Sequence, residues 1–316
     1  LFTDRRGIAF ETMPNEVAVH KIHASGGRGG ILEKTGGTIS LGIGVLEALQ
    51  LFAKFRPNCV IGFGGYPSAP TMIAAILRRL PSAIHEQNAV IGRANRLVAR
   101  RVSTIATSFA NTVGLPSHVA ARAVMTGNPV RADFSEVRNK EYPDIGTPGK
   151  NTKILVLGGS QGAKIFSDVV PKAFVAMPAI LRRRFEIMQQ CRPEDIKRVR
   201  DVYQSAEMFP ELAIYFDDVP MRMAAAHIVI TRSGASTVAE LAEAGRPAIL
   251  VPYQHATDDH QSANARAIEA GGAGWLLPHD SFTPEILTNH LKRLINQPEI
   301  ATTAANAAHR LGGHNA

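Results

Sequence analysis

Short apolar runs alternate with amphipathic stretches along the whole chain. In the amphipathic stretches, such as residues 68–80 and 90–101, apolar residues recur at spacings of three and four, which is typical of helices with one buried face. The apolar runs have the length and the flanking glycines of buried strands, so the alternation predicts βα units that feed parallel sheets. The predicted strands are residues 17–22, 59–62, 82–84, 104–106, 153–157, 184–188, 213–216, 228–231 and 248–251.

One segment interrupts this pattern. Residues 138–151 combine Asn, Lys, Glu, Pro, Asp and Gly with almost no aliphatic side chains, which is typical of a linker. The chain of 316 residues is long enough for a sizeable core on each side of it. We therefore predict two Rossmann-like α/β domains facing one another across a cleft, an N-terminal one over residues 1–137 and a C-terminal one over residues 152–316. The chain starts at Leu1 as if part-way through a strand, so we expect upstream sequence to be missing from the N-terminal domain.

Composition restricts the class of protein. The 45% hydrophobic and 20% charged residues are those of a soluble globular protein, and we find no apolar run of the ~18 residues expected of a membrane-spanning helix. There is no signal-peptide pattern, which favours the cytoplasm. The two cysteines, Cys59 and Cys191, lie far apart and outside any CxxC, so neither a disulfide framework nor a zinc site is expected.

The charge is unevenly distributed. Residues 1–132 hold 15 Lys and Arg against 6 Asp and Glu, a net charge of +9, whereas the rest of the chain carries a net charge of −1. A basic N-terminal half indicates a phosphorylated or polyanionic partner, or an anionic membrane surface. Nucleic acid is disfavoured because aromatic residues make up only 6% of the chain and few lie among the basic clusters.

Three predicted strands end in glycine-bearing loops that lead into helices. The loops are IGFGGYPS at residues 61–68, LVLGGSQGA at 155–163 and ITRSGASTVAE at 230–240. Glycine lets the backbone approach a ligand, and a helix start offers unpaired N–H donors to a phosphate. None of the loops is a P-loop or has the GxGxxG spacing of a dinucleotide site. The first is equally compatible with a tight turn, whereas Ser160 adds a hydroxyl to the second and favours a phosphate or sugar contact there.

Polar residues follow the third loop. Glu240 lies two turns into its helix, where its carboxylate could accept both hydroxyls of a ribose. Alone it would be read as a solvated helix residue, but the next strand ends in the polar segment YQHATDDHQ at residues 253–261. His255, Asp259 and His260 match no known metal-ligand spacing, so hydrogen bonds from Gln261 to sugar hydroxyls fit better.

Two more polar segments lie in the N-terminal half. IHEQN, residues 84–88, ends a strand with four ionisable or amide side chains. Their burial without partners would cost free energy, which indicates a site. TGNPVR, residues 126–131, places Arg131 where its guanidinium could clamp a pyrophosphate through two hydrogen bonds. A structural salt bridge is an equal alternative for Arg131.

Together these segments resemble the MurG family of GT-B glycosyltransferases. The matching sequences are IGFGGYPSAP, IHEQNAVIGRANRLVARRV, TGNPVR, LVLGGSQGAK and RSGASTVAELAEAGRPAILVPYQHATDDHQSANA, which span most of the chain from Ile61 to Ala265. The resemblance implies an inverting hexosyltransferase that moves GlcNAc from UDP-GlcNAc to lipid I, an undecaprenyl-pyrophosphoryl-linked acceptor, to form lipid II in peptidoglycan synthesis. It also implies a peripheral protein on the cytoplasmic face of the plasma membrane.

The resemblance further implies roles for single residues. The backbone of Phe216 would meet uracil, Glu240 the ribose, Ser160 and Arg131 the phosphates, and Asn88 and Gln261 the GlcNAc hydroxyls. Tyr66 and Glu86 would lie nearer the acceptor. The donor set implied in this way is Asn88, Arg131, Ser160, Phe216, Ala235, Ser236, Thr237, Val238, Ala239, Glu240 and Gln261.

The sequence departs from the family in one respect. The family opens with a glycine-rich loop of the form GGTGGH, whose histidine is a favoured general base, and this sequence contains no such loop. Glu86 is the best remaining candidate for the base. Because the chain also lacks the DxD motif of metal-dependent transferases, we expect neither a metal nor another cofactor.

Two helical segments are candidates for membrane docking. They are Ile76, Leu77 and Leu80 beside Arg78 and Arg79, and Leu97 and Val98 beside Arg96, Arg100 and Arg101. Two ordinary amphipathic helices are the alternative.

Three other functions stay open. A GT-B enzyme with another lipid or small-molecule acceptor would keep the donor site. A UDP-GlcNAc 2-epimerase would share the fold but should carry acidic catalytic residues that we do not find. A UDP-sugar-binding protein without activity is favoured only if the glycine-rich loop is truly absent. Nothing in the sequence indicates the oligomeric state.

Overall fold

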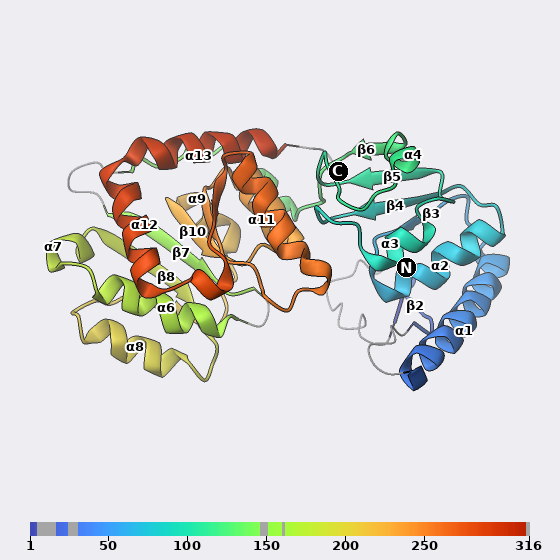
Figure 1. The fold of residues 1–316 in the computed structure, drawn as a ribbon, viewed down its shortest axis with the longest axis horizontal. Helices are drawn as coiled ribbons and strands as arrows, with labels where there is room; N and C mark the ends of the chain where they lie inside the picture. Colours follow the sequence, from blue (N-terminus) through green and yellow to red (C-terminus); the bar gives the residue numbers. More distant parts are fainter. Residues whose placement is uncertain (5–16, 25–30, 146–150, 160–161, 314–316) are drawn as a thin grey trace. The chain divides into compact units, whose positions relative to one another are not determined.

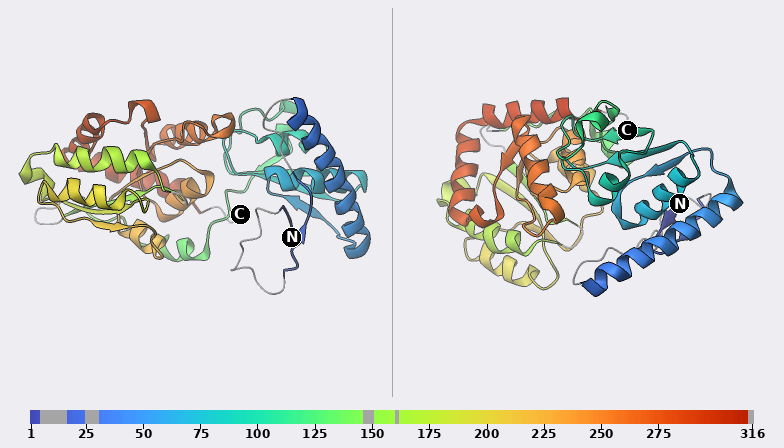
Figure 2. Two further views of the ribbon diagram at one scale, coloured as in Figure 1. Left: turned by 90° about the horizontal axis from the view of Figure 1, so that it is seen from below. Right: turned by 45° about the vertical axis from the view of Figure 1, so that its right-hand side comes forward.

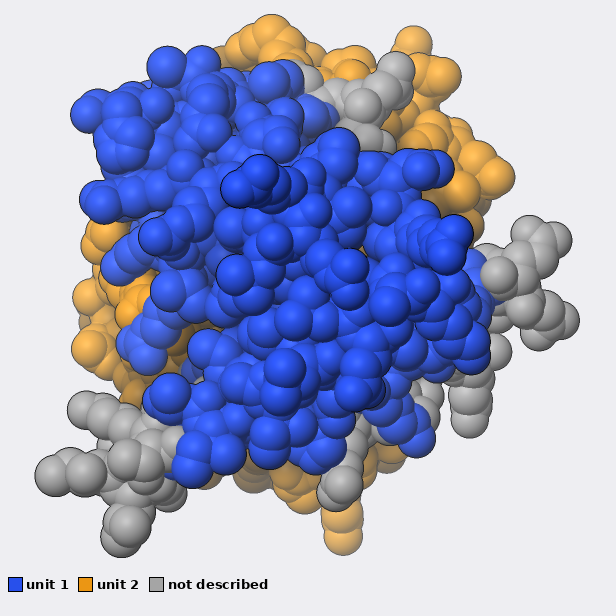
Figure 3. All heavy atoms as spheres, turned by 90° about the vertical axis from the view of Figure 1, so that its right-hand side faces the viewer, with its two compact units in different colours: residues 1–127 blue, residues 128–316 orange. Residues whose placement is uncertain are grey.

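The computed structural model describes residues 1–4, 17–24, 31–145, 151–159 and 162–313, without the side chains of residues 31–35. The chain forms two compact units, Leu1–Gly127 (unit 1) and Asn128–Ala316 (unit 2), which Figure 3 colours blue and orange. This division falls before the predicted linker of residues 138–151. The chain after Gly127 packs with unit 2, starting with the helix α5 (Ala132–Val137).

Unit 1 is an α/β unit whose strands are all parallel (Figure 1). Its four-stranded sheet has the order β3-β4-β5-β6, and β1 and β2 form a separate pair. Helix α1 runs along the outside of the unit next to α2 (Figure 2). The elements of unit 1 are β1 (Phe2–Thr3), β2 (His20–Lys21), α1 (Ile31–Phe55), β3 (Val60–Gly62), α2 (Gly65–Leu77), β4 (Ser82–Glu86), α3 (Arg93–Val98), β5 (Thr104–Thr107), α4 (Ser117–Ala120) and β6 (Ala123–Met125).

The core of unit 1 forms where apolar strand residues meet the apolar faces of its helices. Met72 of α2, Ile84 of β4 and Ile105 of β5 are fully buried in it. Gly62, the last residue of β3, has no room for a side chain, because a Cβ there would lie 2.5 Å from the Ser68 hydroxyl oxygen. The glycine therefore lets α2 pack directly against the strand that precedes it.

A cavity of about 830 Å³ lies between the β1–β2 pair and β3. Its wall is mostly apolar and includes Phe2, Phe52, Val60 and Phe63. Among the described strands β1 pairs only with β2, and β3 pairs only with β4. Within the described residues, each therefore has one edge without a partner strand.

Unit 2 contains one parallel sheet of six strands in the order β12-β11-β10-β7-β8-β9. From β7 the chain moves outward to β8 and β9, and from β10 it moves the other way to β11 and β12. Right-handed crossovers place the helices of these two halves on opposite faces of the sheet. The direction reverses between β7 and β10, so the ends of these two strands form the topological switch point.

The elements of unit 2 after α5 are β7 (Thr152–Leu157), α6 (Lys164–Val175), α7 (Ala179–Arg182), β8 (Phe185–Gln190), α8 (Ile196–Gln204), β9 (Glu211–Ala213), α9 (Val219–Ala225), β10 (Ile228–Thr231), α10 (Ala235–Ala244), β11 (Ala248–Leu250), η1 (Thr257–Asp259), α11 (His260–Ala270), β12 (Gly274–Leu276), η2 (His279–Ser281), α12 (Pro284–Asn296) and α13 (Pro298–Leu311). The central strands β7, β10 and β11 are apolar and buried along nearly their whole length, as expected of a sheet covered on both faces.

Arg246 fixes the segment after α5 to the body of unit 2. Its buried guanidinium donates hydrogen bonds to the carbonyls of Lys140 (3.3 Å), Glu141 (3.0 Å) and Ala224 (2.6 Å). It also lies 5.6 Å from the ring centroid of Tyr142. Burial lowers the pKa of Arg246 to about 10. The start of the predicted linker is therefore part of the packed unit.

The structure confirms most predicted strands and corrects some. Residues 17–22 contribute only β2, and the strand predicted at 213–216 is wrong because β9 ends at Ala213. The strands β6 and β12 and the helix α1 were not predicted. By length and composition alone, Gly36–Phe55 of α1 is long and apolar enough to cross a membrane, and one such helix is by itself weak support for a spanning segment.

Candidate functional site

Open parallel sheets bind ligands outside the carboxyl ends of their strands, at the switch point. In unit 2 this point lies between β7 and β10. Two of the glycine-bearing loops predicted from sequence follow these two strands. The polar segment at residues 253–261 follows β11, the next strand in the sheet. The fold thus brings three of the predicted ligand segments to one edge.

Gly158, the first residue after β7, is closely packed. A Cβ on Gly158 would lie 2.5 Å from the amide nitrogen of Ala163, so only glycine fits there. The Gly158 N–H donates to Oε1 of Gln190 (3.0 Å), and Nε2 of Gln190 donates to the Ile214 carbonyl (3.2 Å). Gln190, which the sequence analysis missed, therefore links this loop to the chain that leads to Phe216. Ser160 lies outside the described residues.

The loop after β10 opens the helix α10. No side chain caps this helix, whose N-cap is Gly234. The backbone N–H groups at Ala235, Ser236 and Thr237 therefore start the helix at the switch point, where unpaired N–H groups and the positive end of the helix dipole favour an anion. Val238 is buried in the core, so only the backbone and the neighbouring side chains of this turn can serve a ligand.

Glu240 and Arg131 lie together in unit 2. The Arg131 Nε is 3.8 Å from Oε1 of Glu240, and the two side chains are 51% and 19% exposed. Burial raises the pKa of Glu240, and the positive charge of Arg131 opposes that rise. The long ion pair and the exposed guanidinium leave both side chains available to a ligand.

Phe216 and Gln261 are both held by local contacts. The ring of Phe216 is buried under the guanidinium of Arg222, whose central carbon is 4.3 Å from the ring centroid. This agrees with a role for the Phe216 backbone rather than its side chain. Oε1 of Gln261 accepts the N–H of Tyr253 (2.9 Å), which orients the amide within the loop.

In unit 1, Glu86 organises the turn after β4. It is 2% exposed, and its two oxygens accept hydrogen bonds from the Asn88 N–H (3.0 Å), the Asn88 amide (3.3 Å), the Gly92 N–H (2.8 Å) and the Asn95 amide (2.8 Å). Glu86 and Asn88 thus lie together, and the roles that the resemblance implies for them stay predictions. Both carboxylate oxygens are engaged by the loop, so the role of Glu86 as a base stays a prediction.

The neighbouring residues join this turn to other strand ends. Nε2 of His85 is 2.8 Å from the Gly127 carbonyl, and the Gln87 amide donates to the Phe63 carbonyl (3.0 Å). The helix that Tyr66 helps to start, α2, follows the same Phe63 loop. The density of polar residues in IHEQN is therefore explained largely by the hydrogen bonds that hold these loops together.

The polar loop after β11 contains several residue types that can bind metals, but their side chains form hydrogen bonds within the same segment. Nδ1 of His260 is 2.6 Å from the Thr257 carbonyl, and Oδ1 of Asp259 accepts the Ser262 hydroxyl (2.6 Å). In the part of the chain that the structure describes, no three His, Cys, Asp or Glu side chains could hold a metal ion together.

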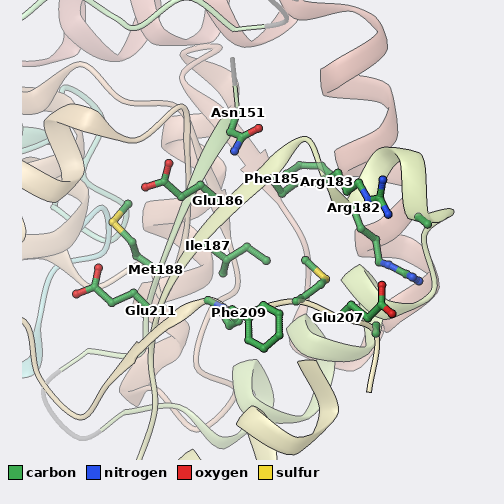
Figure 4. Close-up of a pocket in the computed structure, with 14 residues that line it drawn as sticks. Asn151, Arg182, Arg183, Phe185, Glu186, Ile187, Met188, Glu207, Phe209 and Glu211 are labelled. Atoms are coloured by element: carbon green, nitrogen blue, oxygen red, sulfur yellow. The ribbon is translucent and has the colours of Figure 1, made fainter. Parts of the chain in front are cut away.

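A cavity of unit 2, about 430 Å³, lies at the opposite end of the strands (Figure 4). It is lined by Asn151, Arg182, Phe185, Glu207 and Phe209, among others. These residues precede or begin β7, β8 and β9, whereas ligands bind where strands end. This cavity is not part of the candidate site.

The chain is similar to known glycosyltransferases over nearly its whole length. The family model described as glycosyltransferase family 28 C-terminal domain matches residues 153–314, and that of the N-terminal domain matches residues 1–107. A relative from Rhodospirillum centenum, named UDP-N-acetylglucosamine–N-acetylmuramyl-(pentapeptide) pyrophosphoryl-undecaprenol N-acetylglucosamine transferase, is 49% identical over 98% of this chain and 81% of its own. A relative of the same name from Paramagnetospirillum magneticum is 48% identical over 99% of this chain and 84% of its own.

Solved structures of related proteins have the same fold. The crystal structure of MurG from Acinetobacter baumannii is 27% identical, with a TM-score of 0.77 over 95% of this chain and 82% of that one. A UDP-GlcNAc 2-epimerase from Neisseria meningitidis is 14% identical, with a TM-score of 0.59 over 91% of this chain and 79% of that one, and so shares the fold alone. The matched domain models and the relatives at almost 50% identity together show that the chain belongs to glycosyltransferase family 28 and, within it, to the MurG family.

Proposed function

We propose that this protein transfers GlcNAc from UDP-GlcNAc to lipid I, the muramyl-pentapeptide pyrophosphoryl-undecaprenol acceptor, and so forms lipid II for peptidoglycan synthesis. One observation carries the proposal beyond the similarity to named transferases. The uncapped start of α10, Glu240 and the Gln261 loop gather at the switch point of unit 2, with Arg131 beside Glu240. They supply donors for a pyrophosphate, an acceptor for a ribose and an amide for a sugar.

The reaction is a direct displacement at the anomeric carbon. The C4 hydroxyl of the acceptor attacks C1 of GlcNAc, its proton passes to a base, and UDP leaves with inversion. Negative charge grows on the departing pyrophosphate, where N–H groups at the start of α10 and the Arg131 guanidinium can stabilise it. Such an arrangement needs no metal for the leaving group.

The proposal is tested by a transfer assay with radiolabelled UDP-GlcNAc and a lipid I analogue. We expect label to appear in the lipid product only when both substrates are present. An equal rate with an unrelated lipid or small-molecule acceptor would contradict the assignment of lipid I. Transfer to neither acceptor, with UDP-GlcNAc still bound, would favour a binding protein without activity.

We also propose that unit 1 docks on an anionic membrane surface at the cytoplasmic side, where a lipid-linked acceptor is found. Of the docking residues predicted from sequence, Val98 is buried, and Ile76 and Leu80 pack against the core. Leu77 and Leu97 are exposed. Helix α1 adds Ile39, Ile43 and Leu46, exposed at spacings of three and four on one face.

This docking predicts that Ile39→Gln combined with Leu46→Gln lowers sedimentation with anionic vesicles about tenfold, because two apolar side chains lose their lipid contact. The side chains are 65% and 62% exposed, so the fold should be unaffected. Ile180→Gln, at an exposed position of unit 2 (78%), serves as the control and should not change binding. Unchanged sedimentation of the double variant would exclude this face of α1 as the docking surface.

A further inference from the structure

Arg232 lies at the switch point, and the donor contacts proposed above give it no role. It directly follows β10 in the chain. Its Nη1 donates to the carbonyl oxygens of Val251 (3.0 Å) and Pro252 (2.8 Å), where β11 ends. The same nitrogen lies 3.3 Å from Nδ1 of His279, in the segment after β12.

Two aromatic rings flank the guanidinium. Its central carbon is 5.4 Å from the ring centroid of Phe166 in α6, the helix after β7, and 5.5 Å from that of Tyr253, just after β11. One side chain therefore contacts the segments that follow four neighbouring strands, β12, β11, β10 and β7. No carboxylate among the described residues forms an ion pair with Arg232, and burial lowers the pKa of its guanidinium. Holding a cation there without an anion costs free energy, which indicates a function.

The contacts of Arg232 hold the start of the loop that leads to Gln261, the second residue of α11. The Pro252 carbonyl that Arg232 holds belongs to the peptide group whose N–H, on Tyr253, donates to Oε1 of Gln261 (2.9 Å). The Tyr253 side chain itself is exposed, as are Gln254 and His255. Arg232 is thus a principal anchor at the start of this exposed loop.

The nucleotide side of the site has separate anchors. The carbonyl of Ser233 accepts a hydrogen bond from the buried amide of Asn264 (3.0 Å). The Ser233 hydroxyl donates to the Gln261 carbonyl (2.8 Å), which holds the backbone of Gln261 but not its side-chain amide. The strand β10 is also held between β7 and β11. Removing the guanidinium should therefore displace the Gln261 side chain more than the start of α10.

We propose that Arg232 is a positioning residue for the sugar half of the donor. By fixing the end of β11 it presents the amide of Gln261 to GlcNAc, without touching the sugar itself. The inference rests on the proposed function, in which Gln261 binds GlcNAc and the start of α10 binds the nucleotide.

The test compares the affinities of Arg232→Met for UDP-GlcNAc and for UDP by calorimetry. We expect the Kd for UDP-GlcNAc to rise about tenfold and the Kd for UDP to change less than about twofold, because the Gln261 amide loses its fixed position while the nucleotide contacts stay in place. KM for UDP-GlcNAc should rise with kcat little changed. Arg232→Lys keeps the charge on a different side-chain shape, and should show a smaller loss with the same selectivity.

Arg182→Met is the matched control. Nη1 of Arg182 also donates to two carbonyls, those of Val175 and Met177 (both 3.1 Å), but at the other end of the strands. It should change neither affinity. Equal losses for UDP and UDP-GlcNAc in both Arg232 variants, or no loss in either, would overturn the inference. Failure of the unaltered protein to bind UDP-GlcNAc would instead contradict the proposed function.

Discussion

Replacing Glu240 with alanine is expected to raise the Kd for UDP-GlcNAc about 100-fold. A carboxylate that accepts both ribose hydroxyls makes two charge-assisted hydrogen bonds, each worth about 1.5–3 kcal/mol. Glu240 is suited to this role because it is largely buried at the switch point, with Nε of Arg131 3.8 Å from its Oε1. The measurement is donor titration by calorimetry on the variant and the unaltered protein.

Two controls separate a ribose contact from a loss of structure. Glu243→Gln changes a buried carboxylate of the same helix that pairs with Arg138 (3.3 Å), and it should lower stability without changing donor affinity. A 2′-deoxyribose donor should bind the unaltered protein more weakly but bind Glu240→Ala no more weakly than UDP-GlcNAc does. Equal discrimination against the deoxy donor by both proteins would show that Glu240 does not contact the ribose.

The same contact predicts a pH dependence. Above its pKa, Glu240 is ionised and accepts the hydroxyls; as the pH falls through that pKa, protonation removes the charge and the affinity drops. Burial raises the pKa of Glu240, so the drop should begin at a higher pH than for an exposed glutamate. Arg131→Met should shift this drop in affinity to a still higher pH, because the charge of Arg131 lowers the pKa of Glu240.

The second large effect is expected at Glu86. In Glu86→Gln an NH2 group replaces one of the two carboxylate oxygens. The replaced oxygen accepts N–H groups either of Asn88 or of Gly92 and Asn95, so these buried donors lose their acceptor. We expect the free energy of unfolding of unit 1 to fall by about 2 kcal/mol, together with a loss of turnover. Thermal unfolding and the transfer assay measure the two effects.

A loss of stability together with a loss of turnover distinguishes a residue that organises the loop from a general base. Loss of a base alone would lower kcat about 10²–10⁴-fold and leave the unfolding free energy unchanged. The control is Glu47→Gln. The Glu47 carboxylate pairs with His23 at the surface, so its loss should lower the free energy of unfolding by less than about 1 kcal/mol. Near-normal stability and turnover in Glu86→Gln would refute both roles.

Local patterns predicted the strands that lie inside the sheets. Runs such as those of β7 and β10 are apolar because both faces of these strands are covered. The wrong prediction at residues 213–216 arose because apolar residues there are not buried. Ile214 and Tyr215 are apolar but exposed, beyond the end of an edge strand, so hydrophobicity there does not report burial.

Helix α1 was missed because four glycines interrupt its apolar pattern. One of them has a structural reason that no local pattern contains. A Cβ on Gly44 would lie 2.0 Å from the carbonyl oxygen of His23, a residue distant in sequence. The glycine therefore permits close contact between the helix and that segment.

In the site, too, local sequence patterns predicted some residues and missed those that act through contacts distant in sequence. The glycine-bearing loops, Glu240 and Gln261 could be predicted because strand ends and helix starts are visible in the sequence. Gln190 and Arg232 could not, because they act through hydrogen bonds to loops that follow other strands. Only the strand order of the sheet brings those loops together.

The most direct test of the donor site is a crystal structure of the protein with UDP-GlcNAc. We predict that the ribose hydroxyls lie within hydrogen-bonding distance of the Glu240 carboxylate, with the pyrophosphate at the start of α10 and uracil against the backbone of Phe216. A nucleotide bound elsewhere, such as in the cavity beside Arg182 and Phe209 at the opposite end of the strands, would contradict the account.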